Sequence, residues 1–218
     1  MRTTPVGRCG RLGLGLALVL LVVQGAAATE VGIRYGHGDL RGSRLFPGSG
    51  DLGGTKLMGL QLLLDTLPLI DVEVAGEFYE EEFDFHDAIL GGEIARGEGT
   101  LSDLALLATG KIGLPLPFLP LGSAYAGLGL GAHFVDLDLE AEPEDGGKAD
   151  EVEDAVEDAV RDIAGEETEV EWHGVLGVKF GLLVLPINIF AEARYQDVTG
   201  EKAPDLASAY VGLNLRFE

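Results

Sequence analysis

Cysteine is almost absent from the chain. Its one cysteine, Cys9, precedes the first apolar run, and no thiol follows it. Small exported domains are often held together by disulfides, so this chain has to gain its stability from a packed core, a metal or a membrane. Positive charge is scarce as well, because 15 Lys and Arg stand against 37 Asp and Glu, for a net charge of −22. Nucleic acid is excluded as a partner, since its phosphates would be repelled.

Long apolar runs are absent beyond the N-terminus. There three arginines precede an apolar stretch over 12–23, and small residues follow at 25–28. This order is typical of a cleaved secretory signal peptide, which we predict over 1–28, with the mature domain over 29–218. The apolar stretch is shorter than the ~20 residues that a membrane-spanning helix needs. A lipoprotein cysteine would follow the apolar stretch, so Cys9 is not expected to carry lipid.

Most of the mature domain alternates apolar and polar residues with period two, which predicts β-strands. The last segment is the clearest, because Val211, Leu213 and Leu215 alternate with Gly212 and Asn214. Eight such segments are present, at 30–38, 55–65, 69–79, 103–114, 122–134, 170–184, 187–197 and 208–217.

The connections between these segments alternate in length. Those at 39–54, 80–102, 135–169 and 198–206 are long, whereas those at 66–68, 115–121 and 185–186 are short. An up-and-down meander brings all short turns to one end of a sheet and all long loops to the other. We therefore predict an all-β fold, an eight-stranded antiparallel up-and-down transmembrane β-barrel with short periplasmic turns and long extracellular loops.

One glycine-rich segment formally matches a dinucleotide-binding fingerprint. Gly127, Gly129 and Ala132 fit G-x-G-x-x-G/A, but that motif needs a following helix to receive the pyrophosphate. The residues after Ala132 alternate and then become acidic. We interpret the glycines as inward positions of a strand, where they make room for large neighbours.

The polar face of the predicted strands carries charges of both signs. An eight-stranded barrel is only wide enough for its own side chains, so these charges are expected to pair and to plug the lumen. A soluble sandwich or lipocalin-like barrel would instead bury the apolar face, but aromatic residues gather near the strand ends, as interfacial girdles do. The predicted lumen network is Glu30, Arg34, Asp71, Glu73, Glu77, Lys111, Glu171, Lys179, Glu192, Arg194 and Arg216, and the predicted girdle is Tyr35, Phe78, Phe134, Trp172, Tyr195 and Phe217.

The final segment, YVGLNLRF, resembles the C-terminal strand of small outer-membrane barrels of the OmpA, OmpX and OmpW type. The resemblance extends over essentially the whole mature length. It implies the outer membrane of a Gram-negative bacterium, contact with outer-membrane lipid and lipopolysaccharide, and delivery by periplasmic chaperones. It also implies that the barrel-assembly machinery reads Tyr210, Gly212, Leu215 and Phe217. Such proteins usually end on the aromatic residue, whereas Glu218 follows here.

Two acidic segments are candidate ligand sites. Residues 142–169 hold thirteen Asp or Glu, with apolar residues at helical spacing that predict a short helix over about 149–164. This acidic extracellular loop would bind divalent cations or a cationic partner, or would simply be solvated. Residues 77–86 would form a metal or sugar site, or a strand that emerges from the membrane. The histidines at 37, 86, 133 and 173 lack metal-ligand spacing, so neither metal nor cofactor is expected.

The predicted function is a non-enzymatic barrel with a plugged lumen that serves as an envelope structural or surface-interaction protein. One alternative is a narrow conduit for small hydrophobic molecules. The other is a lipid-modifying enzyme, but no strand serine shares a local motif with a histidine, as a nucleophile and its base would. The inner apolar residues that would line a conduit are Leu63, Leu107, Val175, Leu183 and Phe190.

Overall fold

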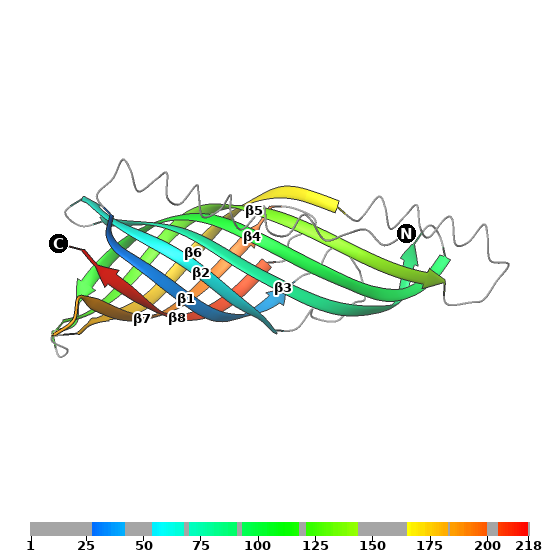
Figure 1. The fold of residues 1–218 in the computed structure, drawn as a ribbon. Coiled ribbons are helices and arrows are strands. Elements are labelled where there is room, and N and C mark those ends of the chain that lie inside the picture. Colours follow the sequence, from blue (N-terminus) through cyan, green and yellow to red (C-terminus); the bar gives the residue numbers. More distant parts are fainter. Residues whose placement is uncertain are drawn as a thin grey trace.

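The structure, a computed structural model, is an eight-stranded antiparallel barrel in which each strand pairs with its sequence neighbours and β8 closes on β1 (Figure 1). It describes residues 28–41, 54–67, 70–90, 93–117, 121–143, 165–182, 184–199 and 205–217. The strands are β1 (Ala28–Arg41), β2 (Gly54–Leu67), β3 (Ile70–Leu90), β4 (Glu93–Pro115), β5 (Gly122–Pro143), β6 (Gly165–Gly181), β7 (Ile187–Val198) and β8 (Asp205–Arg216). The predicted fold class is confirmed.

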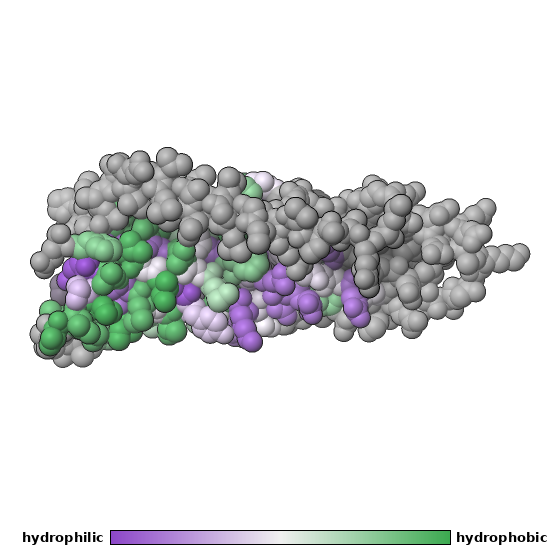
Figure 2. Space-filling view, viewed as in Figure 1, coloured by the Kyte–Doolittle hydropathy of each residue, from purple (hydrophilic) through white to green (hydrophobic). Residues whose placement is uncertain are grey.

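Buried and exposed positions alternate along the strands, as the sequence predicts. The buried positions are mostly polar and the exposed positions mostly apolar, which is the reverse of a soluble protein. In β7, buried and exposed residues alternate almost without interruption. Large apolar side chains lie outside, and Leu128, Leu130 and Leu176 are exposed by 66–70%. Hydrophobic residues gather over the end of the barrel where the C-terminus lies, and hydrophilic ones lie farther along (Figure 2). Because the barrel is closed, each strand can pair its backbone N–H and C=O groups with those of its neighbours. A chain within lipid requires this pairing, since no water is available there.

The central strands are much longer than their neighbours. β3, β4 and β5 have 21, 23 and 22 residues, whereas β1 and β2 have 14 and β7 and β8 have 12. In Figure 1 these three strands project beyond the rest of the barrel, away from the C-terminus.

The prediction of a long loop over 80–102 is therefore wrong. Most of it is the paired continuation of β3 and β4, in which Glu82 lies opposite Thr100. Likewise β5 continues to Pro143 and β6 begins at Gly165 within the predicted 135–169 connection. Acidic runs such as Glu80–Glu82 break the apolar–polar alternation, but the backbone ladder does not depend on it.

Several predicted features lie outside the described residues. They include the signal peptide up to residue 27, the short helix over 149–164 and Leu183. Ala28 is the first residue of β1. Among the residues that the structure does describe, no helix is long and apolar enough to cross a membrane.

Candidate functional site in the barrel lumen

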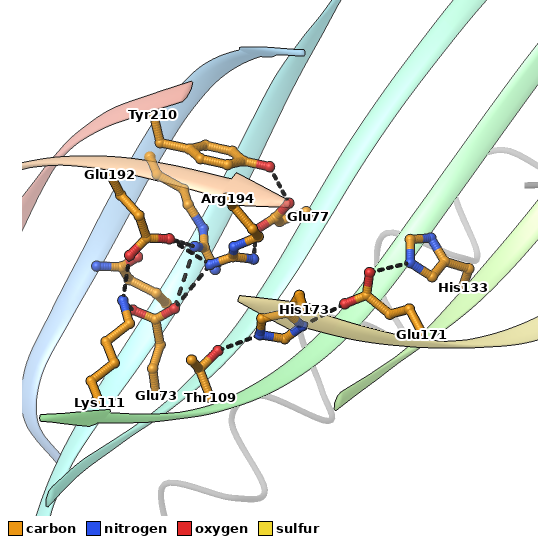
Figure 3. A network of polar contacts seen from close by, with 12 residues as sticks. Glu73, Glu77, Thr109, Lys111, His133, Glu171, His173, Glu192, Arg194 and Tyr210 are labelled. Carbon is orange, nitrogen blue, oxygen red and sulfur yellow. Dashed lines mark hydrogen bonds and ion pairs between the residues drawn. The ribbon is translucent and has the colours of Figure 1, made fainter. Parts of the chain in front are cut away.

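A compact charge network occupies the middle of the lumen, and Figure 3 shows it from close by. Lys111 Nζ lies 2.6 Å from carboxylate oxygens of both Glu73 and Glu192. Arg194 reaches Glu77 at 2.6 Å and Glu192 at 2.7 Å. The six members, three cations and three carboxylates, are Arg34, Glu73, Glu77, Lys111, Glu192 and Arg194. Their side chains are at most 6% exposed, so their charges are compensated by one another rather than by bulk water.

Two tyrosines cover this network. The Tyr210 hydroxyl donates a hydrogen bond of 2.6 Å to Glu77, and its ring centroid lies 5.4 Å from the Arg34 guanidinium carbon. The Tyr125 hydroxyl donates to Glu192 at 3.0 Å, while Lys111 Nζ lies 4.7 Å from the Tyr125 ring centroid. Both rings therefore offer a hydroxyl to an anion and a π-face to a cation.

Glycines make room for these large side chains. A Cβ atom on Gly177 would collide with the Tyr125 ring, and one on Gly129 would collide with the His173 imidazole. Gly129 belongs to the segment that matched the dinucleotide fingerprint. Its position in the middle of β5 supports the interpretation of that segment as a strand.

A second polar chain joins β4, β5 and β6 next to the charge network (Figure 3). Thr109 Oγ1 lies 2.8 Å from His173 Nε2, and His173 Nδ1 lies 2.7 Å from Glu171 Oε1. The other oxygen of Glu171 lies 3.1 Å from His133 Nε2, and His133 Nδ1 lies 2.5 Å from Asp103 Oδ2. All five residues are at most 3% exposed.

The period-two alternation places Thr109, His133 and His173 on the polar face of their strands, but it did not single out Asp103 or predict that these residues meet. The i, i+2 spacing of Glu171 and His173 was the available signal, because it places both on one face of a strand. The partners on β4 depend on strand register, which alternation alone does not specify.

A polar cluster closes the end of the lumen that carries the short turns. Glu30 accepts hydrogen bonds from Asn188 at 2.7 Å and Asn214 at 3.0 Å. Lys179 and Arg216 reach the same carboxylate at 3.4 and 3.6 Å. Between this cluster and the charge network lies a polar-lined cavity of about 60 Å³, a volume that can hold a few water molecules.

Toward the opposite end, many inward positions are apolar, although Thr55, Gln196 and Ser208 are buried inward positions as well. Leu101 and Leu137 lie directly opposite one another in register. The lumen was predicted to be polar, and this apolar layer was missed. Its buried members, each at most 2% exposed, are Leu57, Leu101, Val135, Leu137, Val198 and Leu206.

The other predicted residues take the following places. Asp71 is half-buried beside the small cavity, and the Arg216 side chain is 53% exposed at the mouth of the barrel. Tyr210 and Gly212 face the lumen, whereas Leu215 and Phe217 are exposed on the outside. The girdle residues Tyr35, Phe134, Trp172, Tyr195 and Phe217 are exposed by 42–51%, and Phe78 is half-buried.

The arrangement of Thr109, His173 and Glu171 follows the order of nucleophile, base and orienting acid. Thr109 is 1% and His173 0% exposed, so a substrate has no access to either. Among the described residues, no group of three or more His, Cys, Asp and Glu is arranged to hold a metal ion. The side chain of His86 lies outside the described part.

The closed ladder, the apolar exterior and the ionised interior define an eight-stranded transmembrane β-barrel of the outer-membrane type. No model of a known family matches the chain, and no curated protein matches it significantly. Among solved structures, Neisserial surface protein A is similar with a TM-score of 0.57 and 13% identity, over 88% of this chain and 99% of that one. The outer membrane protein OprG of Pseudomonas aeruginosa gives 0.52 and 14%, over 89% and 99%. The TM-scores show a shared fold, and identities of 13–14% carry nothing beyond the fold.

Proposed function

We propose that the protein is a non-enzymatic barrel of a Gram-negative outer membrane whose lumen is plugged by paired charges. It serves as a structural element of the envelope or as a surface-interaction protein. In this proposal residues 1–28 are removed on export, 29–218 form the barrel, and the part of 142–169 that lies between β5 and β6 forms an acidic extracellular loop. Periplasmic chaperones and the barrel-assembly machinery deliver it, the latter through the C-terminal strand.

The observation that carries the proposal is the neutral charge network in the middle of the lumen. A pore requires a continuous path for water, whereas here three cations and three carboxylates face one another at 2.6–3.6 Å. The buried apolar side chains beyond the network would add a second barrier to ions, because a hydrophobic constriction opposes their passage.

Single-channel recording in planar bilayers tests this proposal. We expect no conductance steps from the natural protein. Lys111→Ala combined with Leu101→Ala and Leu137→Ala, which shortens side chains of both barriers, should introduce steps, whereas Lys56→Ala on the outside of β2 is the control and should not. Steady conductance by the natural protein would show that the lumen is open.

The two alternatives predict other behaviour. A conduit would need its inner apolar residues to line an open path, but Leu63, Leu107, Val175 and Phe190 are only 2–6% exposed. An enzyme would need an accessible nucleophile, and hydrolysis of phospholipid or lipid A by the natural protein, lost in Thr109→Val, would favour that alternative.

The acidic segments are the proposed contact surface for cations. Glu80, Glu82, Glu98 and Asp138 are exposed on the projecting parts of β3, β4 and β5, on the same side of the membrane as the loop. Isothermal titration with calcium tests the cation hypothesis. If calcium binding releases or absorbs no heat, the acidic segments are a solvated surface without a cation site.

A further inference from the structure

The outward face of the barrel carries an apolar groove over the neighbouring strands β7, β8, β1 and β2. Its volume is about 540 Å³. Gly59 and Gly212 belong to inward positions, so their backbone forms part of the floor. The apolar walls, most of them half exposed, are Ile33, Tyr35, Met58, Ile189, Val211 and Leu213.

Positive charge lies at one end of this groove. Tyr35 and Met58 are directly opposite one another, and the next outward pair along the same strands is His37 and Lys56. Two residues along a strand span about 7 Å. Both side chains are exposed, and no ion pair joins Lys56 to another described residue.

The position of His37 and Lys56 along the barrel axis indicates which part of the membrane they contact. Tyr35 belongs to the aromatic girdle, whose rings lie at the level of lipid headgroups. His37 and Lys56 are therefore at or just above that level, on the side that leads to the long connections. The groove extends from there into the hydrocarbon layer.

The nearby carboxylates lie farther from the groove than Lys56 does. Asp39 is the next outward residue of β1 and lies opposite Gly54 and Ala207. The register of β2 with β3, which pairs Met58 with Phe78, places Glu80 beside Lys56 on the side of β2 away from the groove, where it accepts a hydrogen bond from Ser102. An anionic group at groove height would therefore meet Lys56 before it meets either carboxylate.

We propose that this face binds one phosphorylated lipid of the outer leaflet, with an acyl chain in the groove and a phosphate on Lys56 and His37. An apolar slot with a cationic end matches the two halves of such a lipid. The inference rests on the proposed outer-membrane location and adds to it a specific contact.

Lipid titrations of the full chain in neutral detergent test the proposal, with lipid A as the probe and native mass spectrometry as the readout. We expect one tightly bound copy, and about fivefold weaker binding by Lys56→Gln, the loss typical of one basic residue near an anionic lipid. Val211→Trp, which fills the groove, should weaken binding as well. Leu176→Trp, on the outward face of β6 and 66% exposed, is the matched control and should bind like the natural protein.

Two further arms distinguish lipid from free phosphate and from nonspecific adsorption. Phosphate-free lipid A should bind several-fold more weakly, and millimolar inorganic phosphate should not compete. Equal binding by Lys56→Gln and Val211→Trp, or competition by inorganic phosphate, would overturn the proposed site. Heat-modifiable gel migration and membrane fractionation of each variant are scored separately. Loss of barrel migration or of membrane location in the natural protein would refute the proposed function instead.

Discussion

Replacement of Lys111 by methionine should strongly destabilise the barrel. The substitution keeps the length of the side chain but removes the cation that lies 2.6 Å from both Glu73 and Glu192. At an effective dielectric constant of ~20, each contact is worth about 6 kcal/mol before desolvation. The desolvation of the buried ammonium opposes this by several kcal/mol, and loss of one partner from a buried pair typically costs about 3–5 kcal/mol. We expect the free energy of unfolding to fall by about that amount.

The assay is urea unfolding of the refolded chain in lipid vesicles, followed by heat-modifiable gel migration. Lys56→Met is the matched control in vesicles of zwitterionic lipid, which offer no anionic lipid to Lys56; this lysine is exposed on the outside of β2, and its replacement should change stability by less than about 1 kcal/mol. The double variant with Glu192→Gln restores the balance of cations and carboxylates and should recover part of the loss. A cost below about 1 kcal/mol for Lys111→Met would refute the reasoning, because a buried carboxylate pair would then tolerate the loss of its shared cation.

Three further predictions use the same unfolding assay or a fluorescence readout. Tyr210→Phe removes a donor to Glu77 and should cost about 1–3 kcal/mol; an unchanged midpoint would mean that water replaces the hydroxyl. Gly177→Val collides with the Tyr125 ring and with the Ala191 carbonyl oxygen and should cost about 1–3 kcal/mol, a loss that Tyr125→Ala in the same chain should relieve only in part. Trp172 is the only tryptophan and is 47% exposed on the outer face. Its fluorescence in vesicles should be quenched by lipids brominated near the headgroup more than by those brominated at the chain ends.

The alternation of the sequence predicted which face each strand turns to lipid, but not which residues meet across the lumen. Glu73 and Lys111 were both assigned inward, and they meet between neighbouring strands. The contact between Lys111 and Glu192 crosses 81 residues of sequence and depends on the tilt and stagger of the closed barrel. Spacing along one strand carries no information on such pairs.

The alternation did not predict the projecting parts of β3, β4 and β5, and the reason is a different one. Within lipid, a strand has to alternate because its two faces meet different surroundings. Beyond the membrane that requirement lapses, and residues 80–82 place three consecutive glutamates in a paired strand. Period-two analysis therefore locates the membrane-embedded length of a strand rather than its full length.

The distribution of charge has a consequence for where the protein acts. Its central lumen network balances three cations against three carboxylates, although the whole chain carries −22. The excess negative charge therefore belongs largely to residues elsewhere, among them the thirteen Asp and Glu of residues 142–169. With the lumen plugged, as we propose, no solute can reach its interior. Contacts with other molecules then depend on the lipid-facing surface, where Lys56 is a rare cation, and on the acidic segments beyond the membrane.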